Sequence, residues 1–481
     1  MLLEVVVAVF ALTQLVYFVG NCALATLLVC RSDAVVDDRT LERVVAEAAE
    51  HDRERPLARP DGGSGSGITS PPSGTERPAD GSQPGAASDC RLPASAVRRI
   101  RVLVPIYRER PAVLEETLDN IAAQRYPTAN VTVSVIYEPD DPTVSAVREA
   151  VAARRSNLAV EFVAVDRAAL AADRSPGDWT FRGTGVPQTK AAALTYAFTT
   201  LSFAADDVVT VFDSDTQVPL DTFELAAAGL VEYDIVQAKQ TARNVGDGLL
   251  PLLESMGIAA WSDLIYANSA DGPYQLLGKA YFVPAGVLYD LDRWQLDAVT
   301  EDMALGVAAH ERGCTLGVMD RYVQDLCPAD LKAWVNQKRR WVRGPYRHLL
   351  TPGWSGLERG RFWAGTVLTQ LLSVTNVLGL PVGLAVLWLT LTGSSGAVVP
   401  AALLPLVLFN GVVWCYYGWQ SYRAAWEAVG FESRWAKLRY SLLSNPLAQA
   451  LYATLWAVPV CLALIDAVRG VAPTFDVTPK E

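Results

Sequence analysis

Histidine, paired cysteine and charge are all scarce in this 481-residue chain. With only three histidines, a histidine-rich metal centre is not expected. The seven cysteines include no C-x-x-C pair, so neither a disulfide framework nor a zinc site is indicated. Charged residues make up 19% of the chain, and the net charge is −11. Because no basic region stands out, nucleic acid is not an expected partner.

Long hydrophobic runs are abundant instead, and they gather near the two ends of the chain. Residues 2–29 carry a single charge, Glu4, and exceed the roughly 20 residues that span a bilayer. A cleaved signal peptide would be shorter and would start with basic residues, so we interpret 1–30 as a transmembrane helix. Similar apolar runs within 366–470 predict three more transmembrane spans. The alternative is that these runs are buried helices of a soluble protein. These three candidate spans are residues 366–392, 398–418 and 447–467.

Basic residues predict how these spans are oriented. The loop at 419–446 holds three arginines and one lysine, and a basic stretch at 332–361 precedes the first C-terminal span. Cytoplasmic loops are enriched in such residues. The sequence therefore predicts an integral protein of the cell membrane with both termini outside and the middle of the chain in the cytoplasm.

Composition divides the rest of the chain into segments. Residues 31–97 combine an acidic juxtamembrane segment with a Pro-, Gly- and Ser-rich stretch, which predicts a disordered tether. Residues 98–345 alternate strand-like and helix-like runs, which predicts an α/β domain with a mostly parallel sheet. We expect an interfacial segment at 346–365 and a C-terminal tail at 471–481. The clearest predicted strands are 99–106, 131–138, 159–166 and 208–212, and the clearest helices 111–124 and 188–201.

The strand-like run at 208–212 is followed by two carboxylates, Asp213 and Asp215. In an extended chain, residues i and i+2 point the same way, so both should meet at the strand's carboxyl end, where open α/β sheets bind ligands. Three interpretations fit this pattern. The pattern could be a turn whose Asp side chains bond nearby backbone. It could be a phosphohydrolase of the haloacid-dehalogenase type, with Asp213 as nucleophile and Asp215 as general acid. It could also be a glycosyltransferase D-x-D, where a divalent ion bridges carboxylate and diphosphate.

Other short motifs favour the third interpretation. The motifs, in chain order, are V-P-I-Y-R-E (104–109), K-A-A-A-L-T-Y-A-F (190–198), D-S-D (213–215), T-E-D (300–302) and Q-x-x-R-W (337–341). In these motifs the chain resembles the membrane-integrated family-2 glycosyltransferases, which include cellulose, chitin and hyaluronan synthases. A phosphohydrolase would carry its D-x-D on the first strand of the domain, whereas earlier strands precede it here. A non-catalytic membrane scaffold with a degenerate transferase domain is the remaining alternative.

The resemblance implies a GT-A fold and a hexosyltransferase-like, inverting enzyme. It would move a sugar from a nucleotide-diphosphate sugar, expected to be a UDP-sugar, to a lipid-linked or polysaccharide acceptor at the lipid membrane. Asp302 would be the general base, and Mg²⁺ or Mn²⁺ would bind at Asp213 and Asp215. Glu138 would take the base-recognising place, with Asp140 or Asp141 as alternatives. The implied substrate-binding residues are Pro105, Tyr107, Glu109, Glu138, Lys190, Asp213, Glu301, Gln337, Arg340 and Trp341.

Two of these assignments have simpler structural readings. Asp302 precedes a helix-like run, where a carboxylate also stabilises the helix dipole. On a helix, the Q-x-x-R-W side chains at 337–341 share one face, with Arg340 suited to phosphate oxygens and Trp341 to a sugar ring. The same helix could instead lie at the membrane interface, with Trp334 as the expected membrane contact. An apolar run at 249–267 could be a second interfacial helix, an acceptor-lining helix or core.

Overall fold

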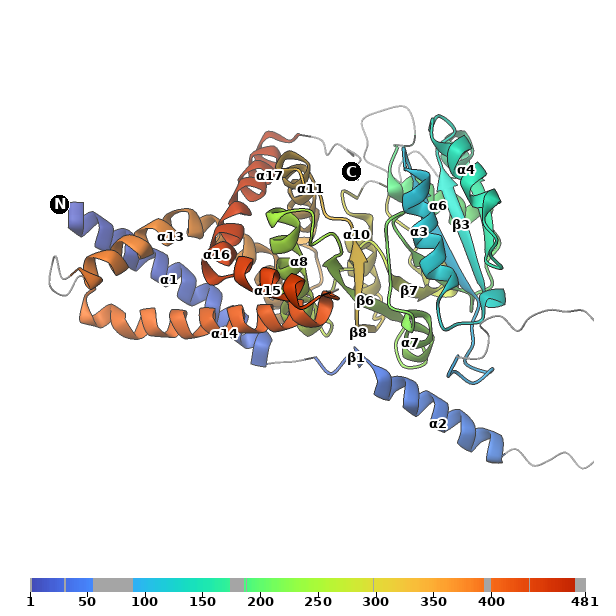
Figure 1. Ribbon diagram of the computed structural model, residues 1–481, viewed down its shortest axis with the longest axis horizontal. Coiled ribbons are helices and arrows are strands. Elements are labelled where there is room, and N and C mark those ends of the chain that lie inside the picture. The colour runs from blue at the N-terminus through green and yellow to red at the C-terminus, as the bar shows by residue number, and fades with distance from the viewer. Residues whose placement is uncertain are drawn as a thin grey trace, which may run out of the picture.

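A computed structural model describes residues 2–29, 32–54, 90–173, 186, 188–296, 298–392, 399–431 and 433–471. Residues 55–89, which hold most of the predicted tether, and the predicted tail after residue 471 lie outside the described residues. Figure 1 shows an α/β domain at one end of the molecule and a group of long helices at the other.

One mixed sheet of eight strands forms the centre of the α/β domain, in the order β1-β8-β6-β7-β5-β2-β3-β4. Neighbouring strands are parallel except where β7 pairs with β5 and β6. The mostly parallel sheet predicted from the sequence is therefore confirmed. The strands are β1 (Val35–Val36), β2 (Ile100–Ile106), β3 (Val131–Tyr137), β4 (Ala159–Ala164), β5 (Val208–Val211), β6 (Ile235–Ala242), β7 (Tyr281–Pro284) and β8 (Leu316–Asp325).

Helices cover both faces of the sheet, because its central strands are apolar on both sides. In β2, Val102 and Val104 pack into one core with Leu114 of α3, while Leu103 packs into a second core with Leu194 of α6. Successive residues of a strand thus bury opposite faces. The helices of the domain are α3 (Pro111–Ala122), α4 (Val144–Ala153), α5 (Arg167–Asp173), α6 (Lys190–Thr200), α7 (Thr222–Gly229), α9 (Ala285–Asp290) and α10 (Glu301–Glu311).

The N-terminal part of the chain is built into the sheet. After α1 (Leu2–Val29), β1 pairs in parallel with β8, with Val35 opposite Val318. The acidic juxtamembrane segment then forms α2 (Asp38–Glu54), where the Asp38 carboxylate pairs with Arg321 of β8 at 2.8 Å. The sheet therefore includes two residues from outside the 98–345 range expected for the domain.

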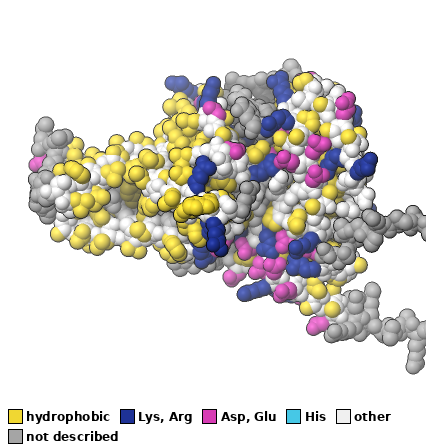
Figure 2. All heavy atoms as spheres, in the orientation of Figure 1, with side chains coloured by type: hydrophobic (Ala, Val, Ile, Leu, Met, Phe, Trp, Pro, Cys, Tyr) yellow, Lys and Arg dark blue, Asp and Glu magenta, His cyan; other side chains and the backbone are white. Residues whose placement is uncertain are grey.

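Four helical segments among the described residues are long and apolar enough to cross a membrane: Glu4–Thr26, Gly356–Leu391, Ala401–Ala428 and Pro446–Arg469. They agree with the four predicted spans. Figure 2 shows hydrophobic side chains covering this end of the molecule, while charged side chains gather over the α/β domain. The segments contain α1, α12 (Gly356–Trp363), a π-helical turn (Ala364–Leu368), α13 (Thr369–Leu391), α14 (Leu404–Ala428), α16 (Pro446–Leu455) and α17 (Ala457–Arg469).

Polar side chains join these apolar helices to one another. Asn21 of α1 donates to the Asn410 carboxamide of α14 at 3.0 Å, and Asn410 donates to the Gln14 side chain at 2.9 Å. Tyr17 of α1 donates to Asn376 of α13 at 2.8 Å. Such bonds associate helices in lipid, where apolar contact alone provides little driving force.

Three more helices lie between the α/β domain and the long helices (Figure 1). The predicted apolar run at 249–267 forms α8 (Leu249–Trp261), followed by a π-helical turn (Ser262–Tyr266). The Q-x-x-R-W motif lies on α11 (Leu331–Arg343), as predicted, and a short 3₁₀ segment (Gly344–His348) follows it. The third helix is α15 (Arg434–Leu443).

Candidate active site

The D-S-D motif forms a turn after β5 and not a continuation of the strand. Pairing of β5 ends at Val211, and Thr216 closes the turn by donating its N–H to the Asp213 carbonyl at 3.1 Å. The expectation that Asp213 and Asp215 point the same way from extended chain is therefore wrong. Asp215 is 2% exposed and accepts a bond from the Leu326 N–H at 3.0 Å, whereas the Asp213 side chain is 31% exposed.

Two lysines contact Asp213, the partly exposed carboxylate of this turn. Lys190, the first residue of α6, donates to Asp213 Oδ1 at 2.6 Å and to the Gly278 carbonyl at 2.9 Å. The Lys279 ammonium lies 3.4 Å from Asp213 Oδ2 and 2.8 Å from Asp325 Oδ2 at the end of β8. Burial lowers the pKa of Lys279, but Asp325, Asp213 and Asp215 outweigh it and raise the pKa above its usual value. This ammonium therefore stays charged among three carboxylates.

The T-E-D motif begins α10, as the sequence predicted for Asp302. Thr300 is the N-cap residue, and Glu301 and Asp302 lie in the first turn. Burial, and then the Glu301 carboxylate, raise the pKa of Asp302 to about 7, while Lys190 and Arg340 act in the opposite direction. The Lys190 ammonium also lies 4.0 Å from Glu301 Oε1. The D-S-D turn and the T-E-D helix thus share one lysine.

Gly278 keeps room for the Asp302 carboxylate. Its φ is +65°, and a Cβ built there would lie 2.8 Å from Asp302 Oδ2. Only glycine meets both conditions without strain. Because the Gly278 carbonyl also accepts the Lys190 bond, this residue fixes the spacing between the D-S-D and T-E-D motifs.

Replacing Gly278 with alanine should therefore lower enzymatic turnover by about tenfold or more, since the new methyl group displaces Asp302. Gly313→Ala is the matched control, because Gly313 has φ +77° but no atom within 4 Å of a built Cβ. Both variants should lose about 1 kcal/mol of unfolding free energy from the left-handed backbone conformation. Steady-state kinetics and thermal unfolding of the two variants check this. Equal turnover in both would show that Gly278 matters for the backbone alone.

The V-P-I-Y-R-E motif joins the end of β2 to the D-S-D turn. Glu109 is 8% exposed and accepts a hydrogen bond from the Ser214 hydroxyl. Pro105 pairs in register with Ile136 of β3, and the Arg108 guanidinium lies 5.2 Å from the ring centroid of Tyr107. These residues lie at or just after the carboxyl end of β2, and Glu109 contacts the D-S-D turn.

The three acidic candidates after β3 have different surroundings. Glu138 pairs with Arg167, the first residue of α5, through both oxygens. Burial raises the pKa of Glu138, although Arg167 opposes the shift. Asp141 accepts bonds from the N–H groups of Arg108 and Thr143 at 2.8 and 2.9 Å, which is a structural role, and Asp140 is exposed. Glu138 is thus the candidate with a charged side-chain partner.

The Q-x-x-R-W helix ends beside T-E-D. A Cβ on Gly344, just after α11, would lie 2.3 Å from the Thr300 hydroxyl, and Arg340 lowers the pKa of Asp302. Gln337 and Trp341 contact the ammonium of Lys338. The expectation that Trp334 faces the membrane is wrong: it is 0% exposed, because its indole N–H donates to the buried Glu254 carboxylate at 2.6 Å.

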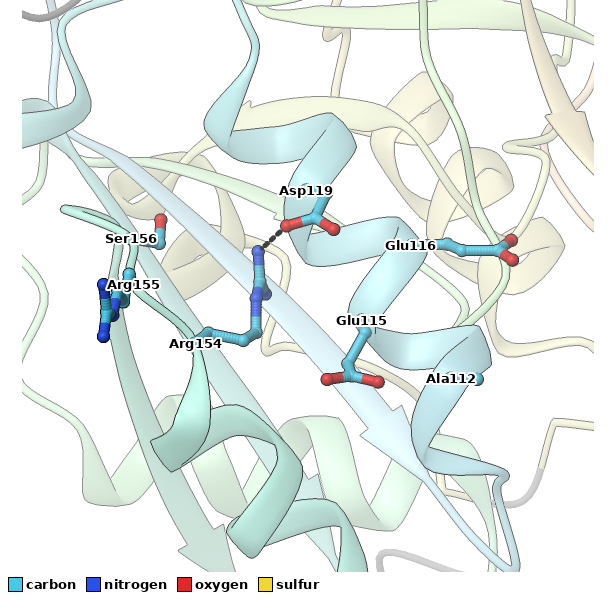
Figure 3. A pocket seen from close by; sticks show the side chains of 7 residues that line it. All are labelled: Ala112, Glu115, Glu116, Asp119, Arg154, Arg155 and Ser156. Carbon is cyan, nitrogen blue, oxygen red and sulfur yellow. Dashed lines mark hydrogen bonds and ion pairs between the residues drawn. The ribbon is translucent and has the colours of Figure 1, made fainter.

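A surface hollow of about 400 Å³ lies away from these motifs. Figure 3 shows Glu115, Glu116 and Asp119 of α3 on one side of it and Arg154 and Arg155 on the other. The Arg154–Asp119 ion pair crosses the hollow. No residue of the five motifs lines it, so it is not part of the site.

Asp213 and Asp215 suit a divalent ion that takes its remaining ligands from the substrate and not from further protein side chains. Within the described ranges, no group of three or more His, Cys, Asp or Glu side chains is arranged to hold a metal ion. Asp213 nevertheless lies 3.4 Å from the Lys279 ammonium, whose pKa is raised by Asp325, Asp213 and Asp215 together. Mg²⁺ is usually bound by one or two carboxylates together with phosphate oxygens of the substrate, which matches this donor set.

Carboxylates and lysines thus gather at the carboxyl ends of strands in an α/β domain that is joined to helices long and apolar enough to cross a membrane. The family model described as "Glycosyl transferase family group 2" matches residues 208–467. This match covers more than half of the chain, and the chain belongs to this family. The protein is therefore a glycosyltransferase.

Two solved structures illustrate what the chain is similar to. One is the mannosyltransferase PcManGT from Pyrobaculum calidifontis in complex with GDP-Man and Mn²⁺, at 19% identity over 76% of this chain and 87% of that chain, with a TM-score of 0.43. The other is residues 1–349 of S. aureus TarS, at 15% identity over 80% of this chain and 95% of that chain, with a TM-score of 0.34. No curated protein sequence matches this chain.

Sequence reasoning missed Gly278, Lys279, Asp325 and Arg167. A Gly-Lys pair just before the strand-like run at 281–284 was the available signal for the first two. Asp325 ends a strand that the sequence analysis did not predict. The role of Arg167 depends on its ion pair with Glu138, which is 29 residues away in the chain, so no local pattern indicates it.

Proposed function

We propose that this glycosyltransferase moves a sugar from a nucleotide-diphosphate sugar to a lipid-linked or polysaccharide acceptor, with inversion at the anomeric carbon. One observation carries the proposal: Lys190 joins the D-S-D turn, through Asp213, to Gly278, against which the T-E-D carboxylate of Asp302 lies. A general base and a cluster that can hold a diphosphate thus meet at one edge of the sheet.

Asp302 is the general base in this proposal. The acceptor hydroxyl oxygen attacks the anomeric carbon, the bond to the nucleoside diphosphate breaks, and Asp302 accepts the hydroxyl proton. A base works best when its pKa is close to the working pH. The pKa of Asp302, raised to about 7 by burial and Glu301, suits this role. A single displacement of this kind inverts the anomeric configuration.

Cationic side chains stabilise the leaving diphosphate. Lys190 lies between Asp213 and Glu301, and Arg340 acts electrostatically on Asp302, so both charges are close to the reacting atoms. Preorganised charges of this kind stabilise a developing anion strongly. Mg²⁺ or Mn²⁺, when bound at Asp213 and Asp215, would neutralise part of the diphosphate charge.

The remaining motif residues bind the two ends of the substrate pair. Glu138, paired with Arg167, provides a carboxylate that binds the base of the nucleotide. We propose that the donor is a UDP-sugar. Gln337 and Trp341 lie on the helix that reaches T-E-D, and we assign them to the acceptor. A Trp ring provides a flat apolar surface for a sugar ring.

We propose that the α/β domain lies in the cytoplasm and that both termini lie outside. The exposed apolar side chains of α15, Trp435, Leu438 and Leu442, alternate with basic residues such as Lys437, as in a helix at the cytoplasmic membrane surface. An impermeant thiol reagent should label Asp292→Cys, on the domain surface, only after the cell membrane is opened. A tag after residue 481 should be detected on intact cells. Labelling of Asp292→Cys on intact cells would contradict the proposed topology, because the α/β domain would then lie outside the cell.

A panel of nucleotide sugars tests the proposed function. Purified protein should release nucleoside diphosphate from at least one donor, and only with Mg²⁺ or Mn²⁺. Phosphate release from a phosphomonoester without any nucleotide sugar would instead support the phosphohydrolase alternative. Failure to bind any nucleotide diphosphate in metal would support a non-catalytic scaffold.

A further inference from the structure

A buried ion pair between Glu254 and Lys338, an intervening residue of the Q-x-x-R-W motif, joins three helices. Glu254 of α8 and Lys338 of α11 have side-chain exposures of 0% and 1%, and their charged groups are in contact. The Trp334 indole of α11 donates to the Glu254 carboxylate at 2.6 Å. The Tyr452 hydroxyl of α16 donates to the same oxygen. One carboxylate therefore connects α8, the Q-x-x-R-W helix and a candidate membrane-spanning segment.

Lys338 contacts both motif residues that we assign to the acceptor. Its ammonium donates to Gln337 Oε1 at 3.0 Å and lies 3.5 Å from the ring centroid of Trp341. The rings of Trp456 and Trp334 lie further away, at 5.7 and 6.0 Å. A cation this close to an aromatic face favours one orientation of that ring. The Lys338 ammonium thus contacts the side chains of both Gln337 and Trp341.

Stability alone does not account for such a pair. Removing two charges from water costs several kcal/mol per ion, and apolar residues of similar volume often replace a buried ion pair without loss of stability. A buried pair does, however, fix geometry, because each charge is tied to its partner. In this protein the fixed group is the one that contacts Gln337 and Trp341.

Apart from Arg340, which shares α11 with Lys338, the donor side of the site has other supports. Within the described part of the chain, the hydrogen bonds and ion pairs of Glu254 and Lys338 go to α8, α11 and α16. The D-S-D turn is held instead by Lys190 and Lys279. A change confined to the Glu254–Lys338 pair should therefore leave donor binding intact.

We propose that Glu254 and Lys338 are positioning residues for the acceptor: Glu254 holds Lys338, and Lys338 orients Gln337 and Trp341. Through Tyr452, the same carboxylate ties this orientation to a helix in the candidate membrane region. The inference deepens the proposed function and rests on it.

The test compares single and double variants. Lys338→Met and Glu254→Gln each leave one buried charge or dipole without its partner, so both should lower the midpoint of thermal unfolding. The double variant E254Q/K338M removes both charges at similar volume and should recover most of that loss. If the pair positions the acceptor, the double variant should still show an acceptor KM raised by about tenfold or more. Its donor KM and its rate of donor hydrolysis by water should stay close to those of the wild type.

A matched control uses the neighbouring ion pair of the same helix. Arg339 of α11 pairs with Asp466 of α17 and contacts no motif residue through that pair. R339Q/D466N removes an ion pair between α11 and α17 without touching Gln337 or Trp341, and it should leave the acceptor KM unchanged. If E254Q/K338M fails to fold, Tyr452→Phe serves instead, because it removes one hydrogen bond to Glu254 and no charge. It should raise the acceptor KM by a smaller factor, again without changing donor hydrolysis.

The outcomes separate the two proposals. A folded double variant with a normal acceptor KM would overturn the positioning role while leaving the proposed function intact. A parallel loss of acceptor transfer and donor hydrolysis would also overturn it, since the pair would then support the whole site. If the wild-type protein neither transfers nor hydrolyses any nucleotide sugar, the proposed function fails and the positioning role fails with it.

Discussion

Replacing Asp302 with asparagine should reduce turnover by about 10²–10⁴-fold and change the affinity for the nucleotide sugar little. Asparagine keeps the size and the hydrogen-bonding shape but cannot accept a proton at neutral pH. A base acts in the transition state more than in the ground state, so kcat should fall while donor binding persists. Transfer at saturating donor, together with equilibrium donor binding, measures the two effects separately.

Glu301→Gln is the matched control for this experiment. Glu301 lies in the same first turn of α10, so a helix-dipole effect would be similar for both variants. We expect a much smaller loss of turnover from Glu301→Gln. Near-normal turnover of Asp302→Asn, or loss of donor binding, would make Asp302 a structural carboxylate and Glu301 the next candidate for the base.

The same carboxyl group predicts how the wild-type rate depends on pH. Burial and Glu301 raise the pKa of Asp302 to about 7, so the group is ionised above that pH and protonated below it. Only the ionised form accepts a proton, and the rate should therefore fall by about tenfold for each pH unit below the pKa. A pH–rate profile checks this, and the profile of Asp302→Asn should lack this acidic limb.

Replacing Asp215 with asparagine should weaken donor binding in Mg²⁺ or Mn²⁺ by about tenfold or more, because one charge is lost beside the proposed ion. The fold should persist, since an asparagine oxygen can still accept the bond from the Leu326 N–H. Titration of a nucleoside diphosphate at several metal concentrations measures the effect.

A remote carboxylate provides the control for Asp215→Asn. Asp234 accepts bonds from Thr315 at the surface of the domain, and Asp234→Asn should leave metal-dependent binding unchanged. If Asp215→Asn bound the nucleoside diphosphate with the same metal dependence as the wild type, the assignment of the D-S-D motif to a divalent ion would be wrong.

Local sequence patterns predicted the elements that carry the site. The strand-like run at 208–212 predicted β5 (Val208–Val211). The T-E-D and Q-x-x-R-W motifs were correctly placed at the start of α10 and on α11. Each of these features depends on neighbours within a few residues. The turn at Asp213 was one of three interpretations of the D-S-D pattern, and the pattern did not single it out, because alternation along a strand says nothing about where pairing stops.

Features that depend on distant partners could not be predicted. Gly278 lies against Asp302, which is 24 residues further along the chain. Lys279 forms an ion pair with Asp325 at the end of β8. Trp334 looked like a membrane contact on its helix, but its partner Glu254 is 80 residues away. In each case the tertiary contact, and not the local pattern, decides where the side chain lies.

The configuration of the first product tests the proposed mechanism most directly. With water as the acceptor, proton NMR can follow the sugar released from the donor before its anomers equilibrate. A single displacement with Asp302 as base predicts that the first sugar formed has the anomeric configuration opposite to that of the donor. If the first sugar formed kept the donor's configuration, a covalent or otherwise retaining mechanism would operate, and the role assigned to Asp302 would be wrong.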